Sequence, residues 1–437
     1  MSETTLFPMP EPTESRPVVL PEGQPRVQWA DRSQMEFRIV DLDSLVPGDH
    51  RVRGIWAFVE GLDLRALYAE IRAVEGGVGR SPIDPKILLA LWLYATTEGI
   101  GSARALDELC RSHAAYQWIC GGVGVNYHTL SDFRTAHETV LSDLLTQSVA
   151  VLMSQGVVEL KRVAQDGMRV RASAGAASFR RERALTECLE EAKAQVECLR
   201  RELEEDPGAT SRREQAARQR AARERQARIE EALRQMPEVA AKKKAEERSE
   251  ARVSTTDADA RVMKMPDGGY RPAFNVELAA DTATQVIVGV DVTNTGSDQG
   301  QMSPMVQQIQ ERYGRCPEEM LVDGGFAKQE DIEKAEQMGT TVYAPVQRPK
   351  TADRDPHLPL PGDSEAIAAW RVRMGTAEAK EIYKERASTA ECVNAQCRNR
   401  GLTQFLVRGL RKVKCVALLY ALAHNCLRVG ALQELIS

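Results

Sequence analysis

Residues 378–398, near the C-terminal end, contain neither proline nor glycine and are rich in good helix formers, which predicts one continuous helix. At about 100° per residue, positions seven apart return to nearly the same face, so Lys384, Glu391 and Arg398 form one stripe. A carboxylate with a cation two turns away on either side can hold a metal ion against a phosphate. The alternative is a solvated, charged helix without a site, and the helix alone does not decide between the two.

The composition of the whole chain narrows the class of protein. With 437 residues it is long enough for two or three domains. A net charge of -5 does not indicate a nucleic-acid binder by itself, so local clusters of charge matter more. Nine scattered cysteines, without a CxxC pair or a secretory signal, predict reduced thiols in a cytosolic protein. The six histidines lie far apart, which argues against a His/Cys zinc site. Since we find no long, charge-free apolar run, we expect a soluble intracellular protein.

The N-terminal part of the chain divides into a tail and a helical region. Residues 1–34 are rich in Pro, Glu and Thr, which predicts a flexible tail. Residues 35–156 have helical periodicity, and two short helices around a polar turn predict a helix-turn-helix DNA-binding domain. In that interpretation Thr129 begins the recognition helix, which presents Ser131 and Arg134 to a DNA groove. An ordinary helical bundle is the alternative.

Strand patterns begin beyond this region and are soon interrupted. Residues 160–165 and 168–171 read as two short strands on either side of Asp166 and Gly167, a common turn pair. Residues 178–250 are rich in Arg, Glu and Ala and predict a helical hairpin. Its first helix has apolar residues at the alternating spacing of a coiled-coil seam. These residues are Leu185, Leu189, Ala192, Val196, Leu199 and Leu203.

Strands then alternate with helices as far as the C-terminal helix. The predicted strands are 261–265, 270–280, 285–292, 320–323 and 340–346, and the predicted intervening helices are 302–313 and 328–338. Asp323 ends one of these strands and is followed by two glycines. After the helix predicted for 378–398, the stretch 398–414 contains six basic side chains and no acid, which predicts contact with phosphates. The last helix, 416–429, is amphipathic.

This order of elements resembles the RNase H-like core of the DDE transposases of bacterial insertion sequences. That family has one Asp on the first strand, a second at the end of the fourth, and a Glu on a later helix. The Glu lies within a Tyr-x2-Arg-x3-Glu-x6-Lys/Arg signature. Asp166, Asp323 and Glu391 take the three acidic positions of the family. The remaining positions of the signature fall to Tyr383, Arg386 and Arg398.

The resemblance implies an activity and the groups that carry it. Asp166, Asp323 and Glu391 would hold Mg²⁺ or Mn²⁺, as two ions, and cut phosphodiester bonds. The substrate would be double-stranded DNA, both at the element ends and at the target, bound by a homodimer or higher oligomer. The DNA contacts would come from the signature, the helix-turn-helix and the basic tail. The residues are Tyr383, Arg386, Arg398, Ser131, Arg134, Arg408, Arg411 and Lys412. One feature fits less well, because on an ideal helix Arg386 lies about 140° from Glu391.

The implied fold class is mixed α+β and α/β. It comprises a helical N-terminal DNA-binding domain and an RNase H-like catalytic core, a five-stranded mixed sheet with helices, interrupted by the coiled-coil hairpin. The expected boundaries are 1–34 for the tail, 35–156 for the helical domain, 178–250 for the hairpin, and 157–177 with 251–437 for the catalytic domain and its basic C-terminal helices. We expect a cytoplasmic, nucleoid-associated bacterial protein.

Two other functions stay open from the sequence. The first is an RNase H-like nuclease or resolvase that cuts DNA without strand transfer. The second is a catalytically inactive DNA-binding or coiled-coil assembly protein derived from a transposase. The presence of all three acids argues against the inactive protein, and only joining of DNA ends separates the first two activities.

Overall fold

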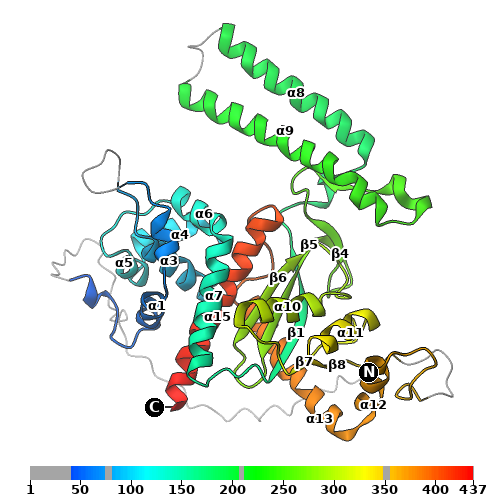
Figure 1. Cartoon of the computed structure of the whole chain (residues 1–437). Helices are drawn as coiled ribbons and strands as arrows, with labels where there is room; N and C mark the ends of the chain where they lie inside the picture. The colour runs from blue at the N-terminus through cyan, green and yellow to red at the C-terminus, as the bar shows by residue number, and fades with distance from the viewer. Residues whose placement is uncertain (1–40, 74–80, 206–210, 348–354, 437) are drawn as a thin grey trace, which may run out of the picture. The chain divides into compact units, whose positions relative to one another are not determined.

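The computed structural model describes residues 41–73, 81–205, 211–347 and 355–436. Leu42–Ser437 form one compact unit, in which helices from both ends of the chain pack around a mixed sheet (Figure 1). The tail predicted for residues 1–34 lies outside the described residues. The mixed α+β fold class expected from the sequence is confirmed.

In the N-terminal region, α3 (Pro85–Thr97) packs most closely against α1, α5 and α6. Asp84 caps α3 by accepting the Lys86 amide, Pro85 occupies its first turn, and its side chains are almost all buried. The helices are α1 (Arg51–Glu60), α2 (Arg65–Ala69), α3 (Pro85–Thr97), α4 (Ala103–Ser112), α5 (Ala114–Cys120), α6 (Tyr127–Ala136) and α7 (Glu138–Ser154).

The last helix, α15 (Leu410–Ile436), joins this region to the sheet, since it contacts α3, α6 and α7 on one side and β6 (Ile287–Thr293) on the other. Its stretch Leu410–Leu432 is long and apolar enough to cross a membrane, but 61% of its apolar window is buried inside the molecule. Burial of this kind is what the core helix of a globular protein shows.

The central sheet has six strands. The strands besides β6 are β1 (Arg162–Arg171), β4 (Arg261–Lys264), β5 (Tyr270–Asp281), β7 (Glu319–Leu321) and β8 (Thr341–Tyr343). The core order is β6-β5-β1-β7-β8, with β7 and β8 parallel to β1 and the first three antiparallel. Strand β1 pairs along one edge of β5, and β4 and β6 both pair along its other edge. Strand β4 is therefore an addition to the expected five-stranded core.

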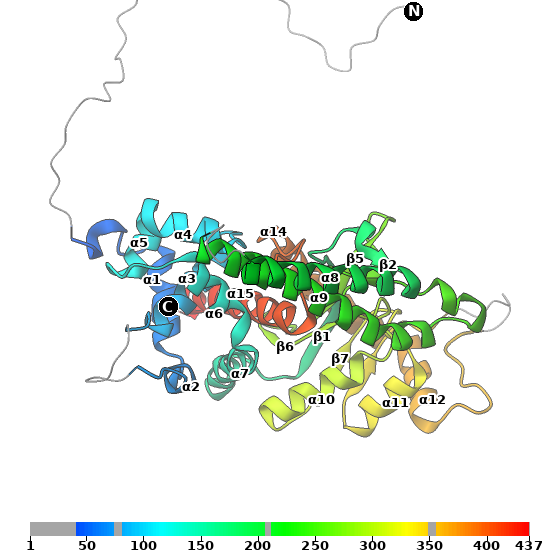
Figure 2. The same ribbon diagram turned by 90° about the horizontal axis from the view of Figure 1, so that it is seen from above.

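Helices cover both faces of the sheet (Figure 2). One face is covered by α10 (Met302–Tyr313) and α11 (Gln329–Gln337), and the other by α15 and by the chain that follows α12 (Glu365–Gly375). That chain comprises α13 (Ala377–Arg386), a π-helical turn (Ala387–Glu391) and α14 (Cys392–Asn399). The helix predicted for 378–398 is therefore present but changes its winding at its centre.

The inserted hairpin is formed by α8 (Glu182–Glu205) and α9 (Arg212–Ala241), which pack against each other. The small sheet of β2 (Phe179–Arg180) and β3 (Val253–Ser254) closes its base. Leu185 and Ala192 of the predicted seam are fully buried in a separate hydrophobic cluster, whereas Leu203 is 36% exposed. The seam is thus well covered near the base and open toward the tip.

The structure corrects the prediction of two strands around Asp166. A single strand, β1, runs through the Asp166-Gly167 pair without a turn. It pairs continuously with β5 from Val163 opposite Asp281 to Arg171 opposite Ala273. The gain from this long ladder outweighs the local preference of Asp-Gly for a turn.

Candidate catalytic site

Asp166 and Asp323 lie beside each other where β1 and β7 diverge. The two strands run parallel with Ala164 opposite Leu321, so carrying the register two residues further sets Asp166 beside Asp323. Asp323 lies in the turn after β7, where its Oδ1 accepts the Gly325 amide at 2.7 Å. The topology therefore brings two acids together that are far apart in the sequence.

Glu391 joins them through the π-helical turn. Four residues separate Arg386 from Glu391, one more than the three of the family signature, so the spacing taken from that signature is wrong by one residue for this chain. The π-turn Ala387–Glu391 takes up the extra residue, since its hydrogen bonds span five residues where an α-helix spans four. Arg386 Nη1 consequently lies 3.0 Å from Glu391 Oε1, although an ideal helix would separate the two residues by about 140°.

The Arg386 guanidinium lies between all three predicted acids. Its Nη2 is 3.8 Å from Asp166 Oδ1 and 3.8 Å from Asp323 Oδ2, and its Nη1 bonds Glu391. The Arg386 side chain is only 11% exposed, whereas that of Glu391 is 61% exposed at the rim. Three carboxylates held close together repel one another, and this buried cation is the group that offsets the repulsion.

The electrostatics of Asp166 reflect this crowding. Burial raises the pKa of Asp166 to about 6, the positive charge of Arg386 lowers it in part, and the neighbouring Asp323 and Asp298 raise it again. Asn394, one turn beyond Glu391 on α14, donates from Nδ2 to Asp166 Oδ2 at 3.0 Å. Asn394 is buried, so this hydrogen bond fixes the orientation of the carboxylate from the helix side.

Known protein families match both parts of the chain that flank the strands. The model described as Transposase domain (DUF772) matches residues 40–136, and the model described as Transposase DDE domain matches residues 360–429. Both matches are to transposase domains, which supports a DDE transposase of an insertion element. The second match includes Glu391 and the other signature residues, while Asp166 and Asp323 lie outside both matches. No curated protein and no solved structure matches the chain.

The donor set of the three acids suits a hard divalent cation. Asp166, Asp323 and Glu391 supply carboxylate oxygens, which Mg²⁺ and Mn²⁺ prefer over other ligands. In the described part of the chain, no three His, Cys, Asp or Glu side chains are grouped closely enough to hold a metal ion as they lie. The reason is geometric, since Arg386 stands in the middle of the three acids. The donor atoms themselves therefore suit such ions, and in this structure a guanidinium lies between them.

The rest of the signature helix divides between the site and the surface. Burial raises the pKa of the Tyr383 hydroxyl, which lies near the acids and Arg386. Glu385 points away and binds Arg162 Nη1 through Oε1 at 2.5 Å. Lys384 binds Glu381 at 2.6 Å on the exposed side. Arg398 is exposed and, within the described structure, makes no hydrogen bond or ion pair with the three acids, so the geometry does not bring it into the site.

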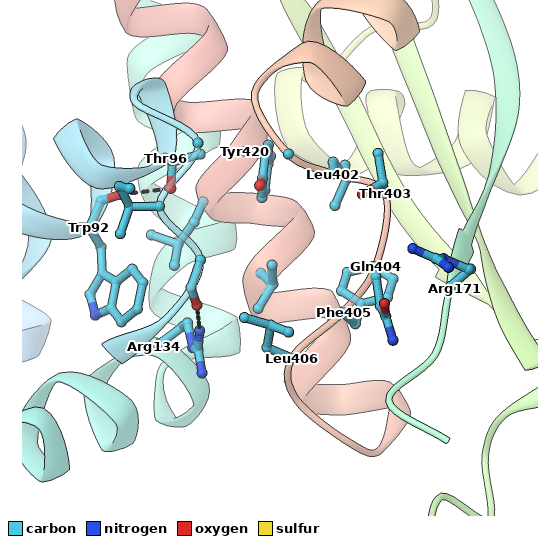
Figure 3. Close-up of a pocket in the computed structure, with 16 residues that line it drawn as sticks. Trp92, Thr96, Arg134, Arg171, Leu402, Thr403, Gln404, Phe405, Leu406 and Tyr420 are labelled. Atoms are coloured by element: carbon cyan, nitrogen blue, oxygen red, sulfur yellow. Dashed lines mark hydrogen bonds between the residues drawn. The ribbon is translucent and has the colours of Figure 1, made fainter. Parts of the chain in front are cut away.

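The structure corrects the role expected of Arg134. Helix α6 begins at Tyr127 with Asn126 as its cap, and Ser131 lies half-buried on it. Arg134 is 7% exposed, its guanidinium lies 4.7 Å from the Trp92 ring centre, and its Nη1 donates to the Gly101 carbonyl. It lines a pocket of about 240 Å³ between α3, α15 and the segment around Leu406 (Figure 3). Arg134 therefore stabilises the packing of the helical region and does not face an outer groove.

The predicted basic tail is at the surface. Arg408, Arg411 and Lys412 are all exposed. Arg408 Nε donates to the Ser173 carbonyl at 3.2 Å, and Arg411 lies 3.6 Å from a carboxylate oxygen of Glu138. Both contacts leave the guanidinium groups largely in solvent, where they can still meet phosphates.

Sequence reasoning missed Asp298 and its partner Arg169. Asp298 follows β6 in an irregular segment, and no periodic pattern or turn motif distinguishes it from other loop acids. Its nearness to the site depends on how that segment folds back across β1. Asn394 had a weak signal, since it lies three residues after Glu391 on the same helix.

Proposed function

We propose that the transposase binds the ends of its insertion element, cuts phosphodiester bonds there, and transfers the freed 3′ end to target DNA. The main support is that Asp166, Asp323 and Glu391 converge on one guanidinium although they come from three distant parts of the chain. A merely solvated helix would not bury Arg386 among these acids.

Each group of the site would have its own role in phosphodiester cleavage. Two divalent cations, Mg²⁺ or Mn²⁺, would activate the attacking water and stabilise the leaving oxygen. Asp166, Asp323 and Glu391 supply the oxygen ligands, and Asn394 holds Asp166 in position. Arg386, once released from the acids, can donate two parallel hydrogen bonds to a DNA phosphate. After cleavage the 3′ hydroxyl would attack the target in the same site, so no covalent protein intermediate is needed.

DNA binding and assembly are proposed from charge and family. The exposed side chains of Arg398, Arg408, Arg411 and Lys412 would contact the DNA backbone, and Tyr383 would contact DNA beside the acids. Ser131 on α6 would also contact DNA, whereas the buried Arg134 would not. A homodimer or higher oligomer would bring two DNA ends together, in the cytoplasm at the nucleoid.

Cleavage of labelled element-end DNA by the full chain in Mg²⁺ tests this function. Asp166→Asn, Asp323→Asn and Glu391→Gln should each abolish cleavage while leaving end binding intact. Glu385→Gln is the matched control, since Glu385 lies on the same helix but binds Arg162, and it should keep most activity. Melting curves of all four variants confirm that they fold.

The products distinguish the functions. Joined strands in a reaction with added target DNA support the transposase. Cleavage without joining would instead indicate a nuclease or resolvase. Binding without cleavage by the wild-type chain would indicate an inactive DNA-binding protein. An active Glu391→Gln variant would remove Glu391 from the site.

A further inference from the structure

A buried polar cluster lies behind the catalytic acids. On β1, Gln165 and Gly167 point to the face opposite that of Asp166, because side chains alternate along a strand. Gln165 donates to the Gln301 carbonyl at 3.2 Å, next to the start of α10, which identifies that face. The cluster consists of Gln165, Arg169, Asn275, Glu277 and Asp298, drawn from β1, β5 and the segment before α10.

Asp298 is the acid of this cluster that pairs with an arginine. Its Oδ1 accepts from Asn275 Nδ2 at 2.7 Å and its Oδ2 accepts from Arg169 Nη2 at 2.9 Å, so both oxygens are fixed. Its side chain is 11% exposed. Glu277 accepts from Gln165 and Asn275, and burial raises the pKa of Glu277 to about 8, which leaves it neutral near pH 7. Within the cluster, the cation that pairs with Asp298 is Arg169.

The Asp298 carboxylate fills the space beside two glycines that adjoin the catalytic acids. A Cβ at Gly167, next to Asp166, would come within 2.5 Å of Asp298 Oδ1. A Cβ at Gly325, two residues beyond Asp323, would come within 3.6 Å of Asp298 Oδ2. One carboxylate thus lies beside both Asp-Gly segments. At position 167 a Cβ would also meet Glu277 Oε1 at 2.9 Å and Asn275 Oδ1 at 3.0 Å, so only glycine fits there.

Two buried amides hold the acids of the cluster in place. Asn275 and Gln165 are fully buried, and Asn275 Oδ1 and Gln165 Oε1 have no hydrogen-bond partner. Both amides already use their NH₂ groups to hold acids, so the orphan oxygens are a cost of keeping those acids in place. Such a cost is tolerated where a fixed geometry matters.

We propose that Asp298 is a positioning residue that sets the spacing of Asp166 and Asp323 and thereby the affinity of the site for divalent cations. It acts as a wedge between the two Asp-Gly segments, locked by Arg169 and Asn275, and does not itself bind the ions. The inference rests on the proposed function, because it assumes that Asp166 and Asp323 are metal ligands.

Mn²⁺ binding to the full chain without DNA, followed by electron paramagnetic resonance, tests the wedge independently of catalysis. Asp298→Ala should weaken Mn²⁺ binding by about 10- to 100-fold, the usual effect of losing a partner of the ligands. Asp298→Asn keeps the shape but loses the bond from Arg169, and it should give a smaller loss. Asp291→Asn is the matched control, since Asp291 also lies at this end of the sheet, on β6, but pairs with Lys414 at 2.7 Å.

Gly167→Ala provides a second approach. Its new Cβ should displace the Asp298 carboxylate and weaken Mn²⁺ binding in the wild-type background. Asp298→Ala removes the closest clash and leaves those with Glu277 Oε1 at 2.9 Å and Asn275 Oδ1 at 3.0 Å, so the losses in the double variant should be less than additive. Additive losses would contradict the wedge.

The outcomes separate this inference from the proposed function. If Asp298→Ala and Asp298→Asn both bind Mn²⁺ as tightly as the wild type does, the inference alone is overturned. This holds even if both variants melt at a lower temperature. A wild-type chain that binds Mn²⁺ but does not cut DNA overturns the proposed function, while the order of affinities still decides the role of Asp298. A wild-type chain that binds no Mn²⁺ overturns both.

Discussion

Replacing Arg386 with methionine should destabilise the metal-free protein and make its stability unusually sensitive to Mg²⁺. The substitution keeps a flexible side chain of similar length and removes the only cation found among the three acids in the described structure. Asp166 and Asp323 then face each other without a counter-charge. The pKa of Asp166, already raised to about 6, rises further because its main lowering influence is gone.

The size of the effect follows from the distances. A unit charge pair at 3.8 Å interacts by about 4 kcal/mol at an effective dielectric constant of about 20. Solvent screens Asp323 and Glu391, which are 39% and 61% exposed, and desolvation of the guanidinium offsets part of the attraction. We therefore expect a net loss of roughly 2–3 kcal/mol, close to the effect of removing one partner from a partly buried pair. That corresponds to a drop of several degrees in Tm.

Mg²⁺ should reverse this loss. A cation that binds only the folded chain at 100 times its Kd adds about 2.7 kcal/mol to stability. In Arg386→Met the ions no longer compete with a guanidinium, so the rise in Tm from EDTA to saturating Mg²⁺ should exceed that of the wild type. Thermal unfolding under both conditions measures it. DNA cleavage should nevertheless be lost, because the phosphate contact is gone.

Arg373→Met is the control for this experiment. Arg373 is partly buried, with 21% of its side chain exposed, and it binds Glu336 on α11, away from the three acids. Its loss should lower Tm equally in EDTA and in Mg²⁺. If Arg386→Met melts like the wild type in EDTA, or gains no more from Mg²⁺ than Arg373→Met does, Arg386 does not offset the acids and the reasoning fails.

Two further predictions concern pH and DNA. His424 is fully buried, and burial lowers its pKa to about 4. Between about pH 6.5 and 4 the folded chain therefore binds fewer protons than the unfolded chain. The free energy of unfolding consequently falls as the pH drops through that window. His424→Gln should reduce the difference in unfolding free energy between pH 7.5 and pH 5 by about 2 kcal/mol in urea titrations. Neutralising Arg408, Arg411 and Lys412 together should weaken DNA binding across sequences. The slope of the logarithm of the binding constant against the logarithm of the salt concentration should become shallower by about 0.9 per lost phosphate contact. An unchanged slope would assign the three residues a structural role.

Much of the fold was predictable because it depends on local patterns. The alternation of strands and helices after residue 261, the cap at Asp84 and the helical hairpin all follow from spacing and composition. The position of Asp166 beside Asp323 followed only from the family resemblance, since nothing local pairs β1 with β7. Periodicity shows that residues share a face, but not which strand lies next to which.

The failures have physical causes that a single sequence hides. The spacing around Arg134 fits a recognition helix, but the stacking of its guanidinium on Trp92 is decided by tertiary packing. The Asp166-Gly167 pair has the composition of a turn, but pairing with β5 keeps it extended. The place of Asp298 depends on the tertiary fold, in which its carboxylate lies in the space beside Gly167 and Gly325.

The π-turn explains how Arg386 and Glu391 meet, and it leads to a last prediction. It behaves as one residue inserted into a regular helix, so deleting one exposed residue of the turn, Ser388, should restore α-helical winding without changing the faces on either side. Arg386 would then lie four residues before the glutamate, the spacing of the family signature, and still reach it. We expect a folded variant that melts no earlier than the wild type and cuts DNA within about tenfold, since α-helical hydrogen bonds replace the strained ones. Loss of Mg²⁺-dependent cleavage in a variant that still melts cooperatively would show that the wider turn itself, and not only the pairing of Arg386 with Glu391, shapes the site.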